Sequence, residues 1–222
     1  MLFNFKGNLY GIKKVEMIIC DENWDEQIIV MNYKNNSWFQ ELGINNKRVV
    51  YRYRINDGII TMNDPDADYY IKDSSMIVWS VREFKECIDD KKGNPNIKEY
   101  IITDRVMNSI SKYYSKKQFV NNDIAKIVVG TKIENIKGIH SLSVIWYQPD
   151  GRIYRLDERT IESEENAIAE VWFWMNSNEM KGDFYKGIWT VEVFLDGRSV
   201  IKDNFIVNDK RKEQYIGFSC IA

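Results

Sequence analysis

Hydrophobic and polar positions alternate along much of the chain, and the clearest case is the run YRYRI at residues 51–55. Its two tyrosines and its isoleucine fall on one face and its two arginines on the other, which is the period-two pattern of a half-buried strand. The pair Asp57-Gly58 follows and predicts a two-residue type I′ turn, in which both central residues need positive φ. Residues 59–61 are β-formers and predict a return strand, and Pro65 ends it because proline cannot donate to a ladder.

Similar short runs fill the rest of the first half of the chain. They are separated by Asn, Asp and Gly, which are the residues that favour turns. About seven such runs in succession are the sequence signature of a β-sandwich. Besides the two strands above, the clearest runs lie at residues 15–20, 27–31, 37–44 and 77–81.

The second half repeats this pattern after a charged segment at residues 86–98, which contains Gly93 and Pro95. Predicted strands lie at 127–131, 142–146, 153–156, 167–175, 189–195 and 200–207. We therefore predict an all-β protein made of two immunoglobulin-like β-sandwich domains in tandem. The expected organisation is a first sandwich at 1–88, a linker at 89–123 and a second sandwich at 124–222.

Residues 100–122 allow two interpretations. Val106, Ile110 and Tyr113 or Tyr114 are spaced as on one face of a helix, and Asp104 suits its N-cap. The same segment also reads as a hairpin with strands at 100–103 and 118–120. The pattern alone leaves both alternatives open.

Composition and charge narrow the classes of function. The chain has 222 residues, a net charge of −2 and no basic block, so nothing points to a nucleic acid. No apolar run approaches the roughly 20 residues of a membrane span, and the first residues lack the features of a signal peptide. We expect no membrane partner and a cytoplasmic location. Cys20, Cys87 and Cys220 are odd in number and far apart, which predicts free thiols.

Candidate catalytic and metal-binding residues are scarce. Asp64, Asp66 and Asp68 alternate like the start of a calcium loop, but the sixth and twelfth positions of that loop hold tyrosine and serine instead of glycine and an acid. His140 is the only histidine, and its place at a strand start suggests a structural bond to a neighbouring loop. We predict no metal, no cofactor and no catalytic residues. An enzyme remains the third alternative, supported only by the abundant carboxylates.

Aromatic residues are the remaining candidates for binding. Trp24 lies in a polar turn, where its ring could stack on a sugar or fold over the edge of the sandwich. Trp172 and Trp174 share a strand face opposite Val171 and Phe173, so one of these pairs should be less buried. Two aromatic rings on an outer sheet face predict a domain contact or a partner surface.

Several of these motifs also occur together in a known family. The order Asn23-Trp24-Asp25, Trp38, YRYRINDG and Asp64-Pro65 resembles the glycogen- and starch-binding modules of branching enzymes and of the β subunit of the AMP-activated kinase. The resemblance covers residues 12–82 and implies an immunoglobulin-like early-set sandwich. The second half is similar to generic bacterial immunoglobulin-like domains.

The resemblance implies a carbohydrate site with Trp24 as a stacking ring and Arg52 as its polar partner. The second stacking tryptophan of these modules would fall near Ile59 or Ile60, and their late asparagine near Met76, so both are replaced here. We predict a non-catalytic binding protein whose ligand is an α-glucan or another polysaccharide, bound weakly. The alternative is a protein-interaction or scaffold protein that kept the fold and lost sugar binding.

Overall fold

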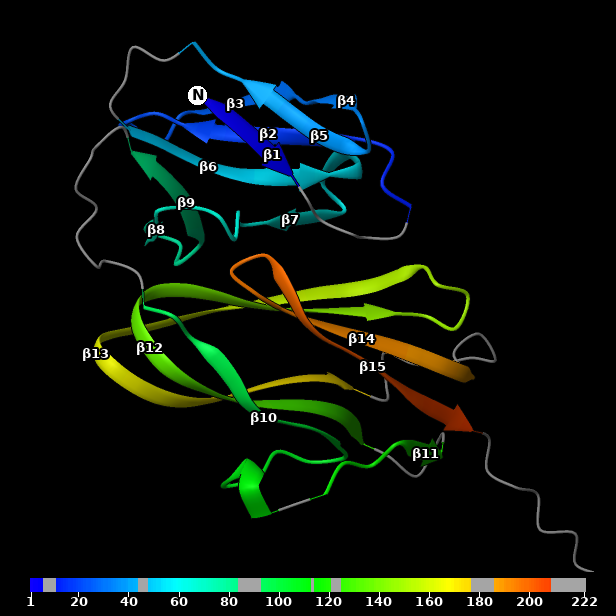
Figure 1. Cartoon of the computed structure of the whole chain (residues 1–222). Coiled ribbons are helices and arrows are strands. Elements are labelled where there is room, and N and C mark those ends of the chain that lie inside the picture. The colour runs from blue at the N-terminus through cyan, green and yellow to red at the C-terminus, as the bar shows by residue number, and fades with distance from the viewer. Residues whose placement is uncertain are drawn as a thin grey trace, which may run out of the picture.

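The computed structural model describes residues 1–5, 11–43, 48–83, 93–112, 114–120, 125–176 and 186–208. These residues form fifteen strands and two single-turn 3₁₀ helices, so the predicted all-β class is confirmed. The strands gather into two units that stack on each other, the N-terminal unit (β1–β9) and the C-terminal unit (β10–β15) (Figure 1). Among the described residues, no helix is long and apolar enough to cross a membrane.

The N-terminal unit is built from two sheets. One sheet has the order β1-β5-β4, and the other has the order β3-β2-β6-β9-β8 with β7 paired to β6. β3 lies at the edge of one sheet and β4 at the edge of the other. Only Met31 separates them, so the chain crosses between the two sheets at this residue. The strands are β1 (Leu2–Phe5), β2 (Val15–Cys20), β3 (Glu26–Val30), β4 (Asn32–Lys34), β5 (Ser37–Glu41), β6 (Arg48–Ile55), β7 (Ile60–Met62), β8 (Tyr69–Lys72) and β9 (Val78–Glu83).

The tyrosines of the YRYRI run point into the core of this unit, as their alternation predicts. Tyr51 and Tyr53 are fully buried and meet the rings of Phe3 and Phe5 edge to face. Both hydroxyls donate to one carboxylate oxygen of Asp64, at 2.7 and 2.9 Å. Burial first, and then the Asp64 charge, raises the pKa of both phenols, which keeps them protonated as donors. Asp64 is therefore a structural acceptor inside the sandwich.

The predicted two-residue turn at Asp57-Gly58 is wrong in length. Ile55 pairs with Ile60, so four residues make the connection, and Asn56, Asp57 and Gly58 all have positive φ. The Asn56 side chain accepts from the backbone N–H groups of residues 13 and 14 and donates to the carbonyl of residue 11. These bonds to a segment more than 40 residues away stabilise the wider turn, and nothing in the local sequence indicates them.

The C-terminal unit is one sheet of six strands that folds over into two layers. The long strands β12 and β13 form a hairpin whose register shifts near residues 133–138 (Figure 1). The start of β12 pairs with β10 in one layer, and its end pairs with β14 in the other. The strands are β10 (Asn96–Thr103), β11 (Gln118–Val120), β12 (Lys126–Tyr147), β13 (Ile153–Asn176), β14 (Gly187–Leu195) and β15 (Arg198–Asn208).

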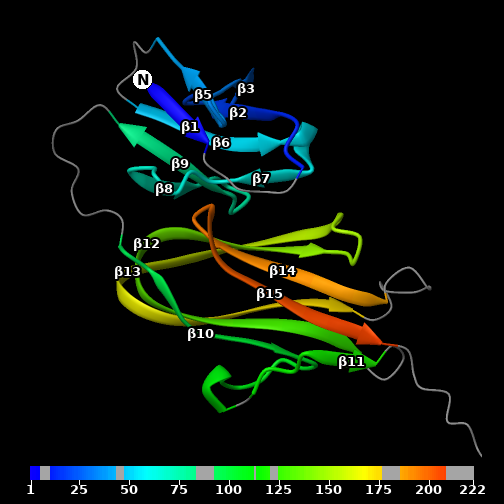
Figure 2. The ribbon, with the colours of Figure 1, turned by 45° about the vertical axis from the view of Figure 1, so that its right-hand side comes forward.

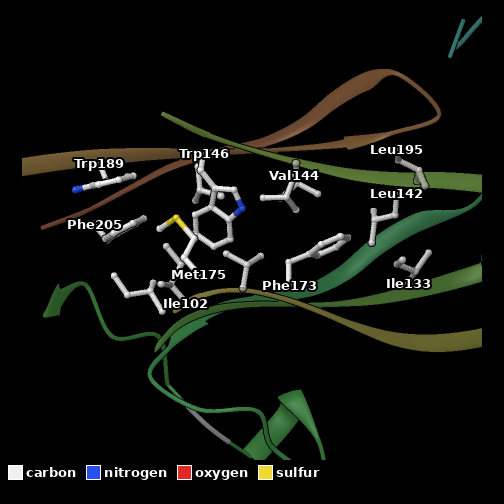
Figure 3. Packing of buried hydrophobic residues seen from close by; sticks show 14 of the residues in the cluster. Ile102, Ile133, Leu142, Val144, Trp146, Phe173, Met175, Trp189, Leu195 and Phe205 are labelled. Atoms are coloured by element: carbon white, nitrogen blue, oxygen red, sulfur yellow. The ribbon is translucent and has the colours of Figure 1, made fainter. Parts of the chain in front are cut away.

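The core of the C-terminal unit lies between these layers. Trp146, Trp189 and Val144 point inward from one layer toward Phe173 and Met175 of the other (Figure 3). The rings of Trp189 and Phe205 stack with centroids 6.0 Å apart. These positions are the inward ones of the predicted alternation, as expected for a sandwich core.

The described part of residues 100–122 contains two strands joined by a segment with one 3₁₀ turn, which favours the strand alternative, although the two strands do not form a hairpin. β10 pairs with β12, and β11 pairs in parallel with β15. One 3₁₀ turn, Ile110–Lys112, lies between them. The predicted linker at 89–123 therefore contains two strands of the C-terminal sheet. Residues 89–92, 113 and 121–123 of this linker lie outside the described residues.

The two units share a packed interface. Ile145, Tyr147 and Phe194, on the outer face of the β12–β14 layer, belong to the same hydrophobic cluster as Ile60 and Met62 of the N-terminal unit. Figure 2 shows β7 and β8 facing this layer. The close contact predicts that the units behave as one body in solution.

Polar contacts surround this apolar interface. Thr160 donates to the Met76 carbonyl at 2.6 Å, and Lys72 pairs with Glu162. The turn between β14 and β15 touches the chain just before Asp64: a Cβ added to Gly197 would stand 1.9 Å from the Asn63 carbonyl oxygen. Glycine is needed at position 197 for this approach.

Candidate functional site

Trp24 is held in a tightly bonded loop at the start of β3. One Asp21 carboxylate oxygen accepts from the backbone N–H groups of Asn23 and Asp25, at 2.8 and 3.0 Å. The backbone N–H of Trp24 donates to the Asp21 carbonyl at 3.2 Å. Trp24 itself has φ 65°, a left-handed conformation that bulky side chains rarely adopt. The loop thus presents Trp24, which is 41% exposed, to solvent.

Arg52 takes a different position from the one predicted. Its side chain is only 4% exposed, and its Nη2 donates to Glu158 of the C-terminal unit at 2.8 Å. Trp79 lies between the two predicted sugar-binding residues: its ring is 5.8 Å from that of Trp24 and 6.0 Å from the Arg52 guanidinium. The structure thus places Trp24 and Arg52 around one buried tryptophan, but Arg52 belongs to the interface between the units and does not reach the exposed face of Trp24.

The positions at which the resembling modules carry their second tryptophan and their late asparagine add no sugar-binding side chain beside Trp24. Ile60 is buried in the core, while Ile59 is exposed. Met76 lies in the β8–β9 turn at φ 64°, and its carbonyl accepts from Thr160. Trp24 is therefore the one predicted sugar-contacting side chain that reaches solvent.

Carboxylates surround the Trp24 loop. Asp73 accepts from the Trp79 indole N–H at 3.1 Å on one side. Cys20 lies beneath the loop, and burial together with the charges of Glu26, Asp21 and Asp73 raises the pKa of its thiol to about 11. The sequence has four acids at residues 21–26 and no lysine or arginine at residues 21–33. The loop that carries Trp24 is therefore acidic, and Arg48 lines one pocket together with its Asp21, Asp25 and Glu26.

An exposed apolar edge continues from this loop. Strand β3 ends its sheet, and no other strand of the described chain pairs with its outer side. Ile28 and Val30 are 45% and 55% exposed. Ile28 pairs with Ile18, and Ile18 pairs with Arg52, so these three lie in one row on the face that carries Trp79. The sequence predicted this strand, but it gave no sign that the strand lies at an edge.

The second predicted surface, Trp172 and Trp174, is only partly open. Trp172 is half-buried and covers Gly130, where an added Cβ would lie 2.5 Å from the ring. Trp174 is 38% exposed, with the Lys126 ammonium 5.7 Å from its ring centroid. Glu170, on the same face, accepts from Ser109. The segment before β11 thus reaches this face, and Trp174 alone remains open.

His140 has both ring nitrogens engaged inside the protein. Nδ1 lies 2.8 Å from an Asp196 carboxylate oxygen, and Nε2 lies 2.9 Å from the Lys137 carbonyl. The other Asp196 oxygen accepts from the Ser141 N–H. This is the structural bond to a neighbouring loop that the sequence suggested. Within the described residues, no group of three or more His, Cys, Asp or Glu side chains is arranged to hold a metal ion.

Comparisons with known proteins add little to this geometry. No model of a protein family matches the sequence, and no curated protein matches it. Among solved structures, a β-glucosidase from Listeria innocua in complex with isofagomine is 14% identical over 52% of this chain and 16% of its own, with a TM-score of 0.35. The CARDB domain of a Pyrococcus furiosus protein in complex with di-metal ions is 14% identical over 54% of this chain and 90% of its own, with a TM-score of 0.28.

A DNA-bound alkylpurine DNA glycosylase from Pseudomonas fluorescens is 10% identical over 51% of this chain and 30% of its own, with a TM-score of 0.34. The alignments thus span less than a third of both enzymes. At these TM-scores the similarities carry no argument about function.

Proposed function

We propose that this chain is a non-catalytic binding protein whose ligand is another protein, bound by the N-terminal unit at Trp24 and β3. The observation that carries the proposal is the position of Arg52. Because its guanidinium is buried against Glu158, the polar half of the expected sugar site is used to join the two units. What remains exposed is one tryptophan, an acidic loop and an apolar strand edge. Exposed aromatic and apolar side chains of this kind favour a protein partner.

A polysaccharide is the second candidate, and the rigid exposure of Trp24 favours it. Hydrogen bonds to a sugar largely replace its bonds to water, so the net gain comes from covering its apolar face. One stacked ring contributes about 1–2 kcal/mol, while association costs at least about 4 kcal/mol. A site with one ring and no neighbouring arginine should therefore be too weak to hold a glucan.

Titration with maltoheptaose, followed by tryptophan fluorescence, compares these two candidates. We expect no saturable change up to millimolar sugar. A saturable change that disappears in Trp24→Ala and persists in Trp174→Ala would establish the polysaccharide candidate instead.

Site-specific photo-cross-linking in the native host tests the protein partner directly. A photoreactive residue at position 24 or 28 should give a discrete protein adduct. The same residue at position 188, an exposed isoleucine of the C-terminal unit, serves as the matched control. Equal adducts at all three positions, or none at positions 24 and 28, would contradict the proposed function.

A further inference from the structure

We infer that the outer side of β3 accepts an extended, basic segment of a partner protein as an added strand. This inference rests on the proposed function and specifies the chemistry of the partner. In a strand at the edge of a sheet, the backbone N–H and C=O groups of every second residue point away from the neighbouring strand and have no partner strand. An extended segment can pair with those groups, and its side chains then lie beside those of the edge strand.

The sequence of this edge lacks the usual protection against such pairing. Natural edge strands carry lysines, inward charges, prolines or bulges that discourage an added strand. Strand β3, EQIIV, carries one charge, Glu26 at its first residue, and no lysine or proline. The β2–β3 register runs from Glu16↔Val30 to Cys20↔Glu26 without a shift. The edge is thus regular and partly apolar, and its one charge lies at the start of the strand.

The long edge strand β13 differs in this respect. β13 pairs only with β12 among the described strands, yet residues 155–165 of β13 include seven charged side chains, RLDERTIESEE. Two of them, Glu158 and Glu162, pair with residues of the N-terminal unit. β13 is therefore protected by charge and by the interface, whereas β3 is not.

Charge complementarity selects a basic partner. Four acids lie at residues 21–26, on both sides of Trp24 in the sequence. The Arg52 guanidinium, 6.0 Å from the Trp79 ring, is paired with Glu158. Arg48 is the one cation that lines a pocket with Asp21, Asp25 and Glu26, so these acids outnumber it. A lysine or arginine placed over Trp24 would gain a cation–π contact and the attraction of these carboxylates. β-branched side chains at alternate positions of the same segment would then lie beside Ile28 and Val30.

Fluorescence anisotropy with a synthetic peptide tests the inference. The probe is fluorescein-labelled Lys-Thr-Val-Arg-Val-Thr-Lys, and its matched control carries N-methyl groups at alternate amides, which removes the donors for strand pairing. We expect saturable binding of the probe and at least a ten-fold weaker Kd for the N-methylated control. Trp24→Ala and Val30→Lys should each weaken binding of the probe at least ten-fold, while Trp174→Ala should leave it within two-fold.

Each other outcome overturns the inference. No saturable binding, equal binding of both peptides, or insensitivity to Trp24→Ala and Val30→Lys would show that β3 does not accept a basic strand. Trp24-dependent self-association in analytical ultracentrifugation would show that a second copy of this chain occupies the edge instead. Protein adducts from positions 24 and 28 without peptide binding would leave the proposed function standing and remove only the strand addition.

Discussion

Replacing Gly197 by alanine should lower the free energy of unfolding by about 3 kcal/mol or more, because the added methyl group would push the two units apart. Gly197 has φ +83°, and its Cβ would meet the Asn63 carbonyl oxygen at 1.9 Å and the carbonyl carbon at 2.8 Å. Backbone atoms cannot rotate away as a flexible side chain does. The Asn63 side chain also accepts from the Ser80 hydroxyl at 3.1 Å, which opposes a shift of this segment.

Gly151→Ala is the matched control in a second Asp-Gly turn. Gly151 has φ +82°, and nothing lies within 4 Å of its Cβ position. This variant should lower the free energy of unfolding by about 1 kcal/mol, which is the cost of placing alanine in a left-handed conformation. The difference between the free energies of unfolding of the two variants, measured with urea, gives the cost of the clash with Asn63 apart from the cost of the left-handed backbone. Equal losses in the two variants would mean that the units do not approach each other at Gly197.

Asp64→Ala should have a similarly large effect, about 4 kcal/mol, through the core of the N-terminal unit. The substitution removes the shared acceptor of two buried hydroxyls, those of Tyr51 and Tyr53, each of which costs about 1–3 kcal/mol when left unpaired. Arg82, whose Nη2 lies 3.7 Å from the same carboxylate oxygen, loses its nearby countercharge as well. Thermal or urea unfolding measures the loss.

Asp66→Ala provides the comparison for this variant. The Asp66 side chain is half exposed and lies 3.7 Å from Arg198, so its loss should cost less than about 1 kcal/mol. A triple variant with phenylalanine at positions 51 and 53 and alanine at 64 should recover part of the stability, because the unpaired hydroxyls are then absent. A loss for Asp64→Ala no larger than that for Asp66→Ala would contradict a structural role for Asp64.

The local alternation of residue types was enough to predict most of the strands and the faces that form each core, although it missed the short strands β1, β4 and β8. Tyr51 and Tyr53 point inward, as the pattern requires, and Trp146 and Trp189 fill the second core. The Trp24 loop also follows from local chemistry, because aspartate and asparagine bond their own backbone neighbours. These features depend on contacts within a few residues, which a sequence pattern records.

Features that depend on distant contacts could not be predicted in this way. Arg52 lies on the polar face of its strand, and alternation alone marks that face as open to water. Its partner Glu158 is 106 residues away, so nothing near Arg52 shows that a second unit covers it. The same limit explains β11, which pairs in parallel with β15, and β13, for which the pattern predicts two strands, at 153–156 and 167–175, where the structure has one. The charged residues between those two segments pair with β12, and Glu158 and Glu162 among them form ion pairs with the N-terminal unit.

A double-mutant cycle on Arg52 and Glu158 tests most directly that Arg52 joins the two units and is not part of a ligand site. We expect Glu158→Gln to lower the free energy of unfolding by about 3 kcal/mol, since it leaves the buried Arg52 guanidinium without its countercharge. Arg52→Met should lower it by about 1–2 kcal/mol, since the Glu158 side chain that it leaves is 20% exposed. The double variant should lose less than the sum, with a coupling energy of about 2 kcal/mol. The more exposed pair Lys72–Glu162 should show a coupling below about 0.5 kcal/mol in the same cycle. Losses under about 0.5 kcal/mol for both single variants, with no coupling between them, would place Arg52 at an open surface and contradict the account.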